Sequence, residues 1–225
     1  MYWILFISVA LLSYIVQNSF KKKIAEASRI PMRSGLTGRE VAEKMLRENG
    51  INDVKVVSIP GELTDNFNPS NKTVNLSEAV YAQPSIAAAA VAAHECGHAV
   101  QHATGYLPVK LRSALVPVVS FSSRIVTWVL LLGMIMLKVF PQLMLAGLIL
   151  FGLTTLFSFI TLPVELNASK RALEWLDTSG LVDYSNRSAA EGALRAAACT
   201  YVVAALSSLA TLIYYIMIFS GGNRR

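Results

Sequence analysis

The stretch HECGHAVQH, residues 94–102, contains all three histidines of the 225-residue chain. On an α-helix, residues four apart lie on one face, so His94 and His98 can bind one metal ion together. Glu95 can then reach the open coordination position of that ion. Zn²⁺ lowers the pKa of a bound water and polarises a carbonyl, and a carboxylate can take the proton of the attacking water. The motif therefore predicts zinc-dependent hydrolysis of a peptide bond, with Glu95 as general base.

The residues around the motif favour a helix. Pro84-Ser85 suits an N-cap, the alanine-rich run 87–93 is strongly helix-forming, and Gly105 can end the helix. The competing interpretation is a buried helix with two hydrogen-bonded core histidines, because so short a pattern can match by chance. Cys96 is not expected to bind the same ion, since two residues along a helix turn it roughly 200° away from His94.

Four long apolar runs dominate a composition that is 54% hydrophobic and 15% charged. They are residues 2–17, 115–137, 139–162 and 199–219, each about long enough to cross a hydrocarbon core of roughly 30 Å. Lys21–Lys23 follows the first run directly, so we interpret that run as an anchor rather than a cleaved signal peptide. We expect an integral membrane protein, mainly α-helical, with about four transmembrane helices in contact with the lipid bilayer.

Lysine and arginine set the expected orientation of these spans. With the N-terminus outside, segments 19–113 and 164–196 share one side of the membrane and hold 12 and 4 basic residues. Only Lys138, Arg224 and Arg225 lie on the other side. The large segments are therefore expected to face the cytoplasm of a multi-pass cell-membrane protein. The same asymmetry accounts for the net charge of +6, and we expect no nucleic-acid partner.

These assignments divide the chain into five parts. A first transmembrane helix (1–18) precedes a cytoplasmic catalytic region with a small sheet and the motif helix (19–113). A transmembrane hairpin (114–163) leads to a cytoplasmic helical region (164–198) and a last transmembrane helix (199–220).

Short strands are expected ahead of the motif helix. Residues 54–59 and 72–76, with a short segment between them, are bounded by turn sequences. These strands can simply pack on the motif helix. Alternatively, Asn66, Phe67 and Asn68 form an exposed edge that receives a substrate peptide by strand addition. The sequence leaves both interpretations open.

A catalytic zinc takes three protein ligands, so one more is needed. Glu165 is the first acidic residue after Glu95, and two spans return it to the side of the motif helix. We expect it to be the third ligand. His102 lies two turns beyond His94, too far along the helix to bind the same ion, and is expected as a polar neighbour. The weaker alternative ligands are Glu174, Asp177, Asp183 and Glu191.

Two polar residues follow the expected third ligand. Ser169, one turn after Glu165, can accept a hydrogen bond from the outer N–H of a zinc-bound histidine, which fixes the tautomer and ring angle. Asn167 is the other polar group nearby. We expect Ser169, Asn167 and His102 to surround the ligands.

Three sequence segments and the four-span layout resemble the YugP-like membrane-bound neutral zinc metallopeptidases over nearly the full length. The segments are HECGHAVQH (94–102), ELNAS (165–169) and SGLTGREVAEKML (34–46). More distantly, the chain resembles the HtpX type of integral-membrane gluzincin, in which a helix bearing HExxH and a later Glu bind zinc.

The resemblance implies one Zn²⁺ per chain, bound by His94, His98 and Glu165, with Glu95 as general base. It also implies a small cytoplasmic α+β gluzincin-like zinc-protease core. In the distant relatives an Asp commonly stands where this chain has Ser169, which is a weaker acceptor. Those relatives also supply an Arg, His or Tyr that stabilises the oxyanion. The open candidates here are Arg171, Tyr184 and Arg187.

Two other functions fit the same residues. A catalytically silent membrane scaffold or chaperone would keep the fold, but it would have no physical need for a carboxylate at Glu95. A zinc hydrolase of a non-peptide amide or ester would use the same motif. We expect the substrate to be a peptide or a membrane protein. Only substrate data separate a peptidase from the non-peptide hydrolase.

Overall fold

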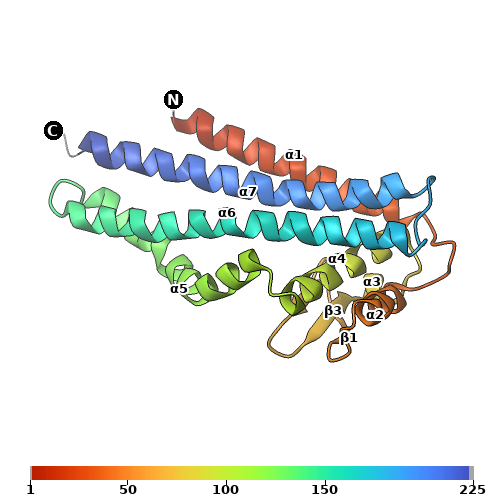
Figure 1. Ribbon diagram of the computed structural model, residues 1–225. Coiled ribbons are helices and arrows are strands. Elements are labelled where there is room, and N and C mark those ends of the chain that lie inside the picture. Colours follow the sequence, from red (N-terminus) through yellow and green to blue (C-terminus); the bar gives the residue numbers. More distant parts are fainter. Residues whose placement is uncertain (1, 223–225) are drawn as a thin grey trace.

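The computed structural model describes residues 2–222, which are mainly helical. Helices α1 (Tyr2–Ser28), α6 (Pro141–Thr178) and α7 (Arg187–Gly222) lie side by side, and α5 (Leu107–Ile135) packs against α6 (Figure 1). The other elements form a lobe below α6 and α7: α2 (Gly38–Glu48), β1 (Lys55–Ile59), β2 (Asn66–Asn68), β3 (Thr73–Ser77), α3 (Glu78–Ala82) and α4 (Ile86–Ala103).

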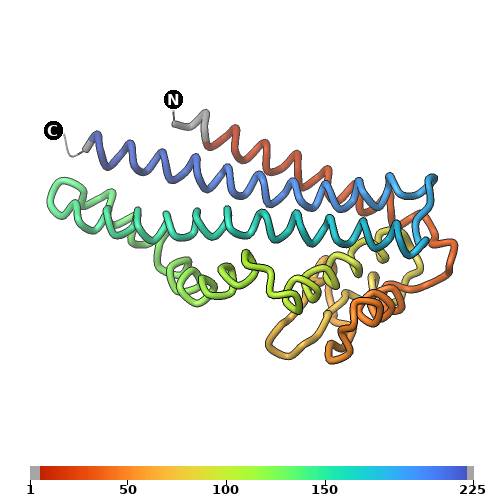
Figure 2. Tube along the Cα trace, viewed as in Figure 1, coloured from red at the N-terminus to blue at the C-terminus, as the bar shows by residue number. Residues whose placement is uncertain are grey.

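The long helices have two distinct ends. The N-terminal half of α1, the C-terminal half of α7 and the turn between α5 and α6 lie towards one end (Figure 2). Helix α4, the sheet and the connection between α6 and α7 lie towards the other. The histidine helix is therefore separated along the bundle from the α5–α6 turn.

Three helices of the described chain, α5, α6 and α7, are long and apolar enough to cross a membrane. They overlap the spans expected at 115–137, 139–162 and 199–219. Helix α1, where the span 2–17 is expected, is not one of the three, so a fourth span stays a prediction. Residue 1 of the expected first segment lies outside the described residues.

Helix α6 is 38 residues long and joins two environments. Its first part holds the apolar run, and its last part packs against α4. The expected boundary at residue 163 falls inside this helix, at Pro163, and the helix continues through it. One helix therefore connects the apolar bundle to the lobe.

The sheet has the order β1-β3-β2. Strand β1 pairs with β3 in parallel, and β2 pairs with β3 antiparallel, with Phe67 opposite Val74. Strand β2 is thus an edge strand, and it contacts α4. Asp65, just before β2, accepts hydrogen bonds from the Ser77 amide (2.7 Å) and hydroxyl (3.1 Å), which fixes the entry into the strand.

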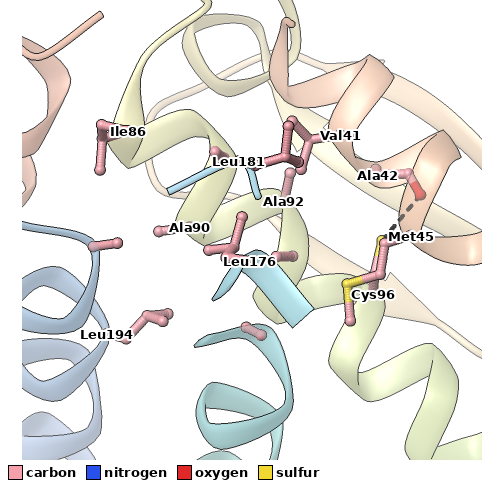
Figure 3. Packing of buried hydrophobic residues seen from close by; sticks show 14 of the residues in the cluster. Val41, Ala42, Met45, Ile86, Ala90, Ala92, Cys96, Leu176, Leu181 and Leu194 are labelled. Carbon is pink, nitrogen blue, oxygen red and sulfur yellow. Dashed lines mark hydrogen bonds between the residues drawn. The ribbon is translucent and has the colours of Figure 1, made fainter. Parts of the chain in front are cut away.

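Helix α4 is the centre of the core. The Ser85 hydroxyl accepts a hydrogen bond from the Ala88 amide, as the expected N-cap requires, and Gly105 follows the helix with a φ of +66°. The small alanines of α4 let neighbouring elements approach closely. The buried side chains packed around α4 include Val41, Met45, Leu176, Leu181 and Leu194 (Figure 3).

Candidate metal centre

His94 and His98 lie one turn apart on α4, with ring centroids 4.8 Å apart and ring planes at 87°. Glu165 of α6 brings its Oε2 to 3.3 Å from the His94 Nε2 and 3.4 Å from the His98 Nε2. Ligand atoms that bind one tetrahedral zinc at about 2.0–2.2 Å lie about 3.3–3.6 Å from one another. These two separations match that spacing, the three ligand atoms all lie within 4.8 Å of one another, and the three side chains form a group able to hold a metal ion.

Gln101 orients the ring of His98. Its side-chain Nε2 donates to the Val164 carbonyl (2.8 Å) and to the Asn167 Oδ1 (3.0 Å). Because a carbonyl can only accept, the amide nitrogen must face Val164, and the Gln101 Oε1 is left facing the His98 Nδ1 at 3.0 Å. That oxygen accepts a hydrogen bond from the Nδ1–H group of His98. The lone pair on the His98 Nε2 then faces Glu165.

Ser169 has the corresponding position beside His94. Its Oγ lies 3.1 Å from the His94 Nδ1. A hydroxyl can accept a hydrogen bond from the Nδ1–H group, and in that case the lone pair of the His94 Nε2 is directed at Glu165. The contact with Gln101 therefore favours the metal-binding tautomer of His98, and the contact with Ser169 permits the same tautomer of His94.

Three acceptor atoms consequently converge on one point. Among the described residues, the Glu165 Oε2 is buried and has no hydrogen-bond partner, while the Oε1 lies 3.4 Å from the Arg112 Nη1. Converging lone pairs without a donor repel one another, and a buried group without a partner is costly. A cation removes both penalties, and two nitrogens with one carboxylate oxygen are a donor set that suits zinc. The residues present fit the metal.

Protonation competes with metal binding at His98. Burial lowers the pKa of His98, but the hydrogen bond that a protonated ring would donate to Glu165, together with the charges of Glu95 and Glu165, raises it more, so the net pKa lies above the usual value. A proton and a metal ion therefore compete for one ring nitrogen. Cys96 does not compete, because burial raises the pKa of its thiol and its Sγ is directed at the Ala42 carbonyl, 3.6 Å away.

Gly97 allows the two ligand-bearing helices to meet. A Cβ on Gly97 would lie 2.8 Å from the carbonyl oxygen of Ala168 and 3.2 Å from its Cα. Both atoms belong to the backbone of α6, so α4 or α6 would have to move. Gly97 stands between His94 and His98 in sequence, and Ala168 lies one turn beyond Glu165. The absence of a side chain at residue 97 thus lets Glu165 lie close to the two histidines.

We expect Gly97→Ala to lower both zinc affinity and stability. Overpacking a tight contact typically costs about 1–3 kcal/mol, and the displaced helix would carry Glu165 away from both histidines. Isothermal titration with Zn²⁺ and thermal unfolding measure the two effects. Gly152→Ala on α6 is the matched control, because no described atom outside its own helix backbone lies within 4 Å of the added Cβ. Unchanged zinc affinity in Gly97→Ala would contradict this role.

A cavity of about 450 Å³, the metal-site cavity, opens over the three side chains. Glu95 lines it and is 8% exposed. Its other walls come from β2, α5 and α7, including Phe67, Arg112 and Tyr201. This volume lies within the range of about 300–1,000 Å³ that is usual for ligand sites. The cavity brings a carboxylate, a guanidinium and a phenol to one metal-binding group.

The chain matches, over residues 2–220, the sequence family described as "Putative neutral zinc metallopeptidase". It belongs to this zinc metallopeptidase family. A curated relative, "Putative membrane protease YugP" of Bacillus subtilis (strain 168), is 40% identical over 221 residues, which cover 97% of each chain. No solved structure gives a significant match. The cofactor of this metallopeptidase is zinc, and its apolar helices and relative support membrane association.

Of the other residues expected near the metallopeptidase site, some line the metal-site cavity and some do not. His102 is exposed on the wall of the metal-site cavity, with its ring centroid 6.0 Å from that of Phe67. Asn167 contacts Gln101 and accepts a hydrogen bond from Arg171 (2.8 Å), so it supports the ligands through Gln101. Asn66 and Phe67 of β2 line the cavity, and Asn68 completes the strand without lining it.

Two groups of sequence candidates lie away from the cavity. The alternative acids are engaged elsewhere: Glu174 with Lys170, Asp177 and Glu191 with Arg187, and Asp183 with Arg33. Of the oxyanion candidates, Arg171 binds Asn167 and Arg187 binds Asp177 and Glu191. Tyr184 is fully exposed. Arg112 and Tyr201 line the cavity instead.

Gln101, Arg112 and Tyr201 are functional candidates that sequence reasoning missed. Gln101 follows His98 by three residues, which places it on the same helix face, so a local signal for it existed. Arg112 lies on α5, which begins at Leu107 soon after the motif helix ends, and Tyr201 lies on α7, far along the chain from the motif. No local spacing indicates that they meet Glu165.

Proposed function

We propose that this protein is a membrane-embedded zinc endopeptidase of the gluzincin type, which hydrolyses peptide bonds at the cytoplasmic face. The observation that carries the proposal is the convergence of His94, His98 and Glu165 on one point beside Glu95. His94, His98 and Glu165 would hold one zinc per chain. The family membership supports this choice of metal and reaction.

Each remaining side chain has a distinct part in the proposed reaction. Bound zinc supplies a water of lowered pKa and polarises the substrate carbonyl. Glu95 accepts the proton of the attacking water and passes it to the leaving amine. Arg112 and Tyr201 offer N–H and O–H donors to the carbonyl oxygen as negative charge develops on it. Gln101 and Ser169 keep the histidine rings in the orientation that binding requires.

The position of β2 supports binding of the substrate as an added strand. Strand β2 is one of the two edge strands of the sheet, and Asn66 and Phe67 line the metal-site cavity. An extended peptide that pairs with the backbone of residues 66–68 would pass over the metal-binding side chains. Its substrate would be a peptide or an extended segment of a membrane protein.

The direct test is zinc dependence in the full-length, detergent-purified protein. We expect one zinc per chain by elemental analysis and cleavage of an unfolded polypeptide such as casein. Chelation with EDTA should remove both, and added Zn²⁺ should restore both. Cleavage that survives complete removal of zinc would contradict the proposal. Zinc binding without any hydrolysis would favour a silent scaffold or chaperone, and cleavage of small esters or amides alone would favour the non-peptide hydrolase.

We expect the lobe and the end of the bundle next to it to face the cytoplasm. The basic residues support this orientation, and the N-terminal half of α1 and the α5–α6 turn lie towards the opposite end from the lobe. In a Cys199→Ser background, Lys22→Cys and Ser70→Cys should be protected from an impermeant thiol reagent added outside intact cells. Phe140→Cys, in the α5–α6 turn, should react. The reverse pattern of labelling would show the opposite orientation.

A further inference from the structure

A second cavity, of about 220 Å³, adjoins the metal-site cavity between α1, α4 and α7. We call it the α1–α7 cavity. Four residues line both cavities: Asp65, His94, Glu95 and Tyr201. A peptide whose scissile carbonyl lies over His94 and Glu95 therefore has a neighbouring side chain at the mouth of the α1–α7 cavity.

The wall of the α1–α7 cavity beyond these shared residues is mostly apolar. Its apolar side chains include Phe20, Ile24, Ala90, Val91, Leu194 and Ala197. Among the described residues, no Lys or Arg lines it, so an acidic side chain would find no cationic partner there. The Asp65 carboxylate is already engaged by Ser77, which supplies both an amide and a hydroxyl hydrogen. The chemistry of the wall thus favours an uncharged, apolar occupant.

The size of the cavity suits one large side chain. A cavity of about 150 Å³ with an apolar lining holds a benzene molecule in another protein, and the α1–α7 cavity is larger. Its space exists because Ala90 on α4 and Ala193 and Ala197 on α7 have small side chains. We infer that the α1–α7 cavity binds the apolar side chain, such as Leu or Phe, of the substrate residue next to the scissile bond. This inference rests on the proposed protease function and adds its substrate class.

Peptides that differ only at the two residues flanking the scissile bond test this inference. We expect the full-length protein in lipid nanodiscs to cleave peptides with Leu or Phe at one of these positions with a kcat/KM about 10–200-fold above those with Ala. Peptides with Asp or Lys at that position should be cleaved most slowly. Hydrolysis at equal rates for all five residues would overturn the inference and leave the proposed function intact. Absence of zinc-dependent hydrolysis would contradict the proposed function itself.

A larger side chain in the wall of the α1–α7 cavity tests the inference, and the same substitution at a neighbouring residue is its matched control. Ala197→Leu should reduce the preference for Leu and Phe by at least about tenfold, while cleavage of the Ala peptide remains. Ala196→Leu adds the same side chain to the preceding residue of α7, which does not line the cavity, and should keep the preference. An unchanged preference in Ala197→Leu would overturn the inference. A lipid that copurifies with the wild type but not with Ala197→Leu, together with an unchanged preference, would identify the cavity as a lipid site.

Binding gives a second readout that needs no turnover. Zinc-loaded Glu95→Gln should bind a fluorescent Leu or Phe peptide more tightly than the matching Asp peptide, as measured by polarisation. Adding Ala197→Leu should remove the difference, and adding Ala196→Leu should not. Equal affinity for the Leu and Asp peptides would contradict the inference even if no cleavage were detected.

Discussion

Glu95→Gln should bind zinc normally and cleave almost nothing. Glutamine keeps the size and helix propensity of the side chain, and the expected ligands His94, His98 and Glu165 are untouched. The variant lacks a carboxylate to accept the proton of the attacking water. General-base catalysis typically contributes about 10²–10⁴-fold, and we expect kcat/KM to fall by that order while elemental analysis still finds zinc.

Two controls make the Glu95 result specific. Glu43→Gln removes an exposed carboxylate that pairs with Arg39 on α2 and should change neither zinc content nor turnover. Thermal unfolding should give the same melting temperature for both variants and the wild type. Hydrolysis near the wild-type rate in zinc-loaded Glu95→Gln would mean that another residue is the base.

Glu165→Ala should lose zinc under conditions in which the wild type is saturated. The substitution removes one of three ligands and leaves two histidine nitrogens with no anion between them. Removing a residue that hydrogen-bonds to a metal ligand typically lowers metal affinity by about 10–100-fold. We expect the loss of a ligand itself to lower zinc affinity by more than that. Competition with a chromogenic chelator measures this loss.

Glu174→Ala is the control for Glu165→Ala. Glu174 lies further along α6, is exposed, and contacts Lys170 at 3.7 Å. Its replacement should leave zinc affinity unchanged. Equal affinities in Glu165→Ala and Glu174→Ala would refute the assignment of Glu165 as a ligand.

The sequence predicts the elements of this fold that depend on local chemistry. The limits of the histidine helix follow from Ser85 at its start and Gly105 after its end, and both have the expected roles. The strand order β1-β3-β2 does not follow in this way, because it depends on which strands pair after the chain has turned back twice. The sequence therefore allows β2 to be an edge strand but does not require it.

The same distinction applies to the candidate site. The spacing of His94 and His98 is a property of one helix, and Glu165 could be selected because the intervening spans return the chain to the same side. The partners of these residues depend on how α4 packs on α6 and α7 and on how α5 packs on α6. For that reason Arg112 and Tyr201 could not be selected from the sequence.

Helix α6 has a consequence for how such an enzyme can be controlled. It carries the apolar run and Glu165 on one uninterrupted backbone, while both histidines belong to α4. A single cut that freed the histidine helix from the apolar bundle would separate it from Glu165 and dismantle the metal group. We therefore expect that no fragment cut free of the apolar bundle keeps the metal group. Lowering the proposed activity would then require degradation of the whole molecule or a smaller supply of zinc or substrate.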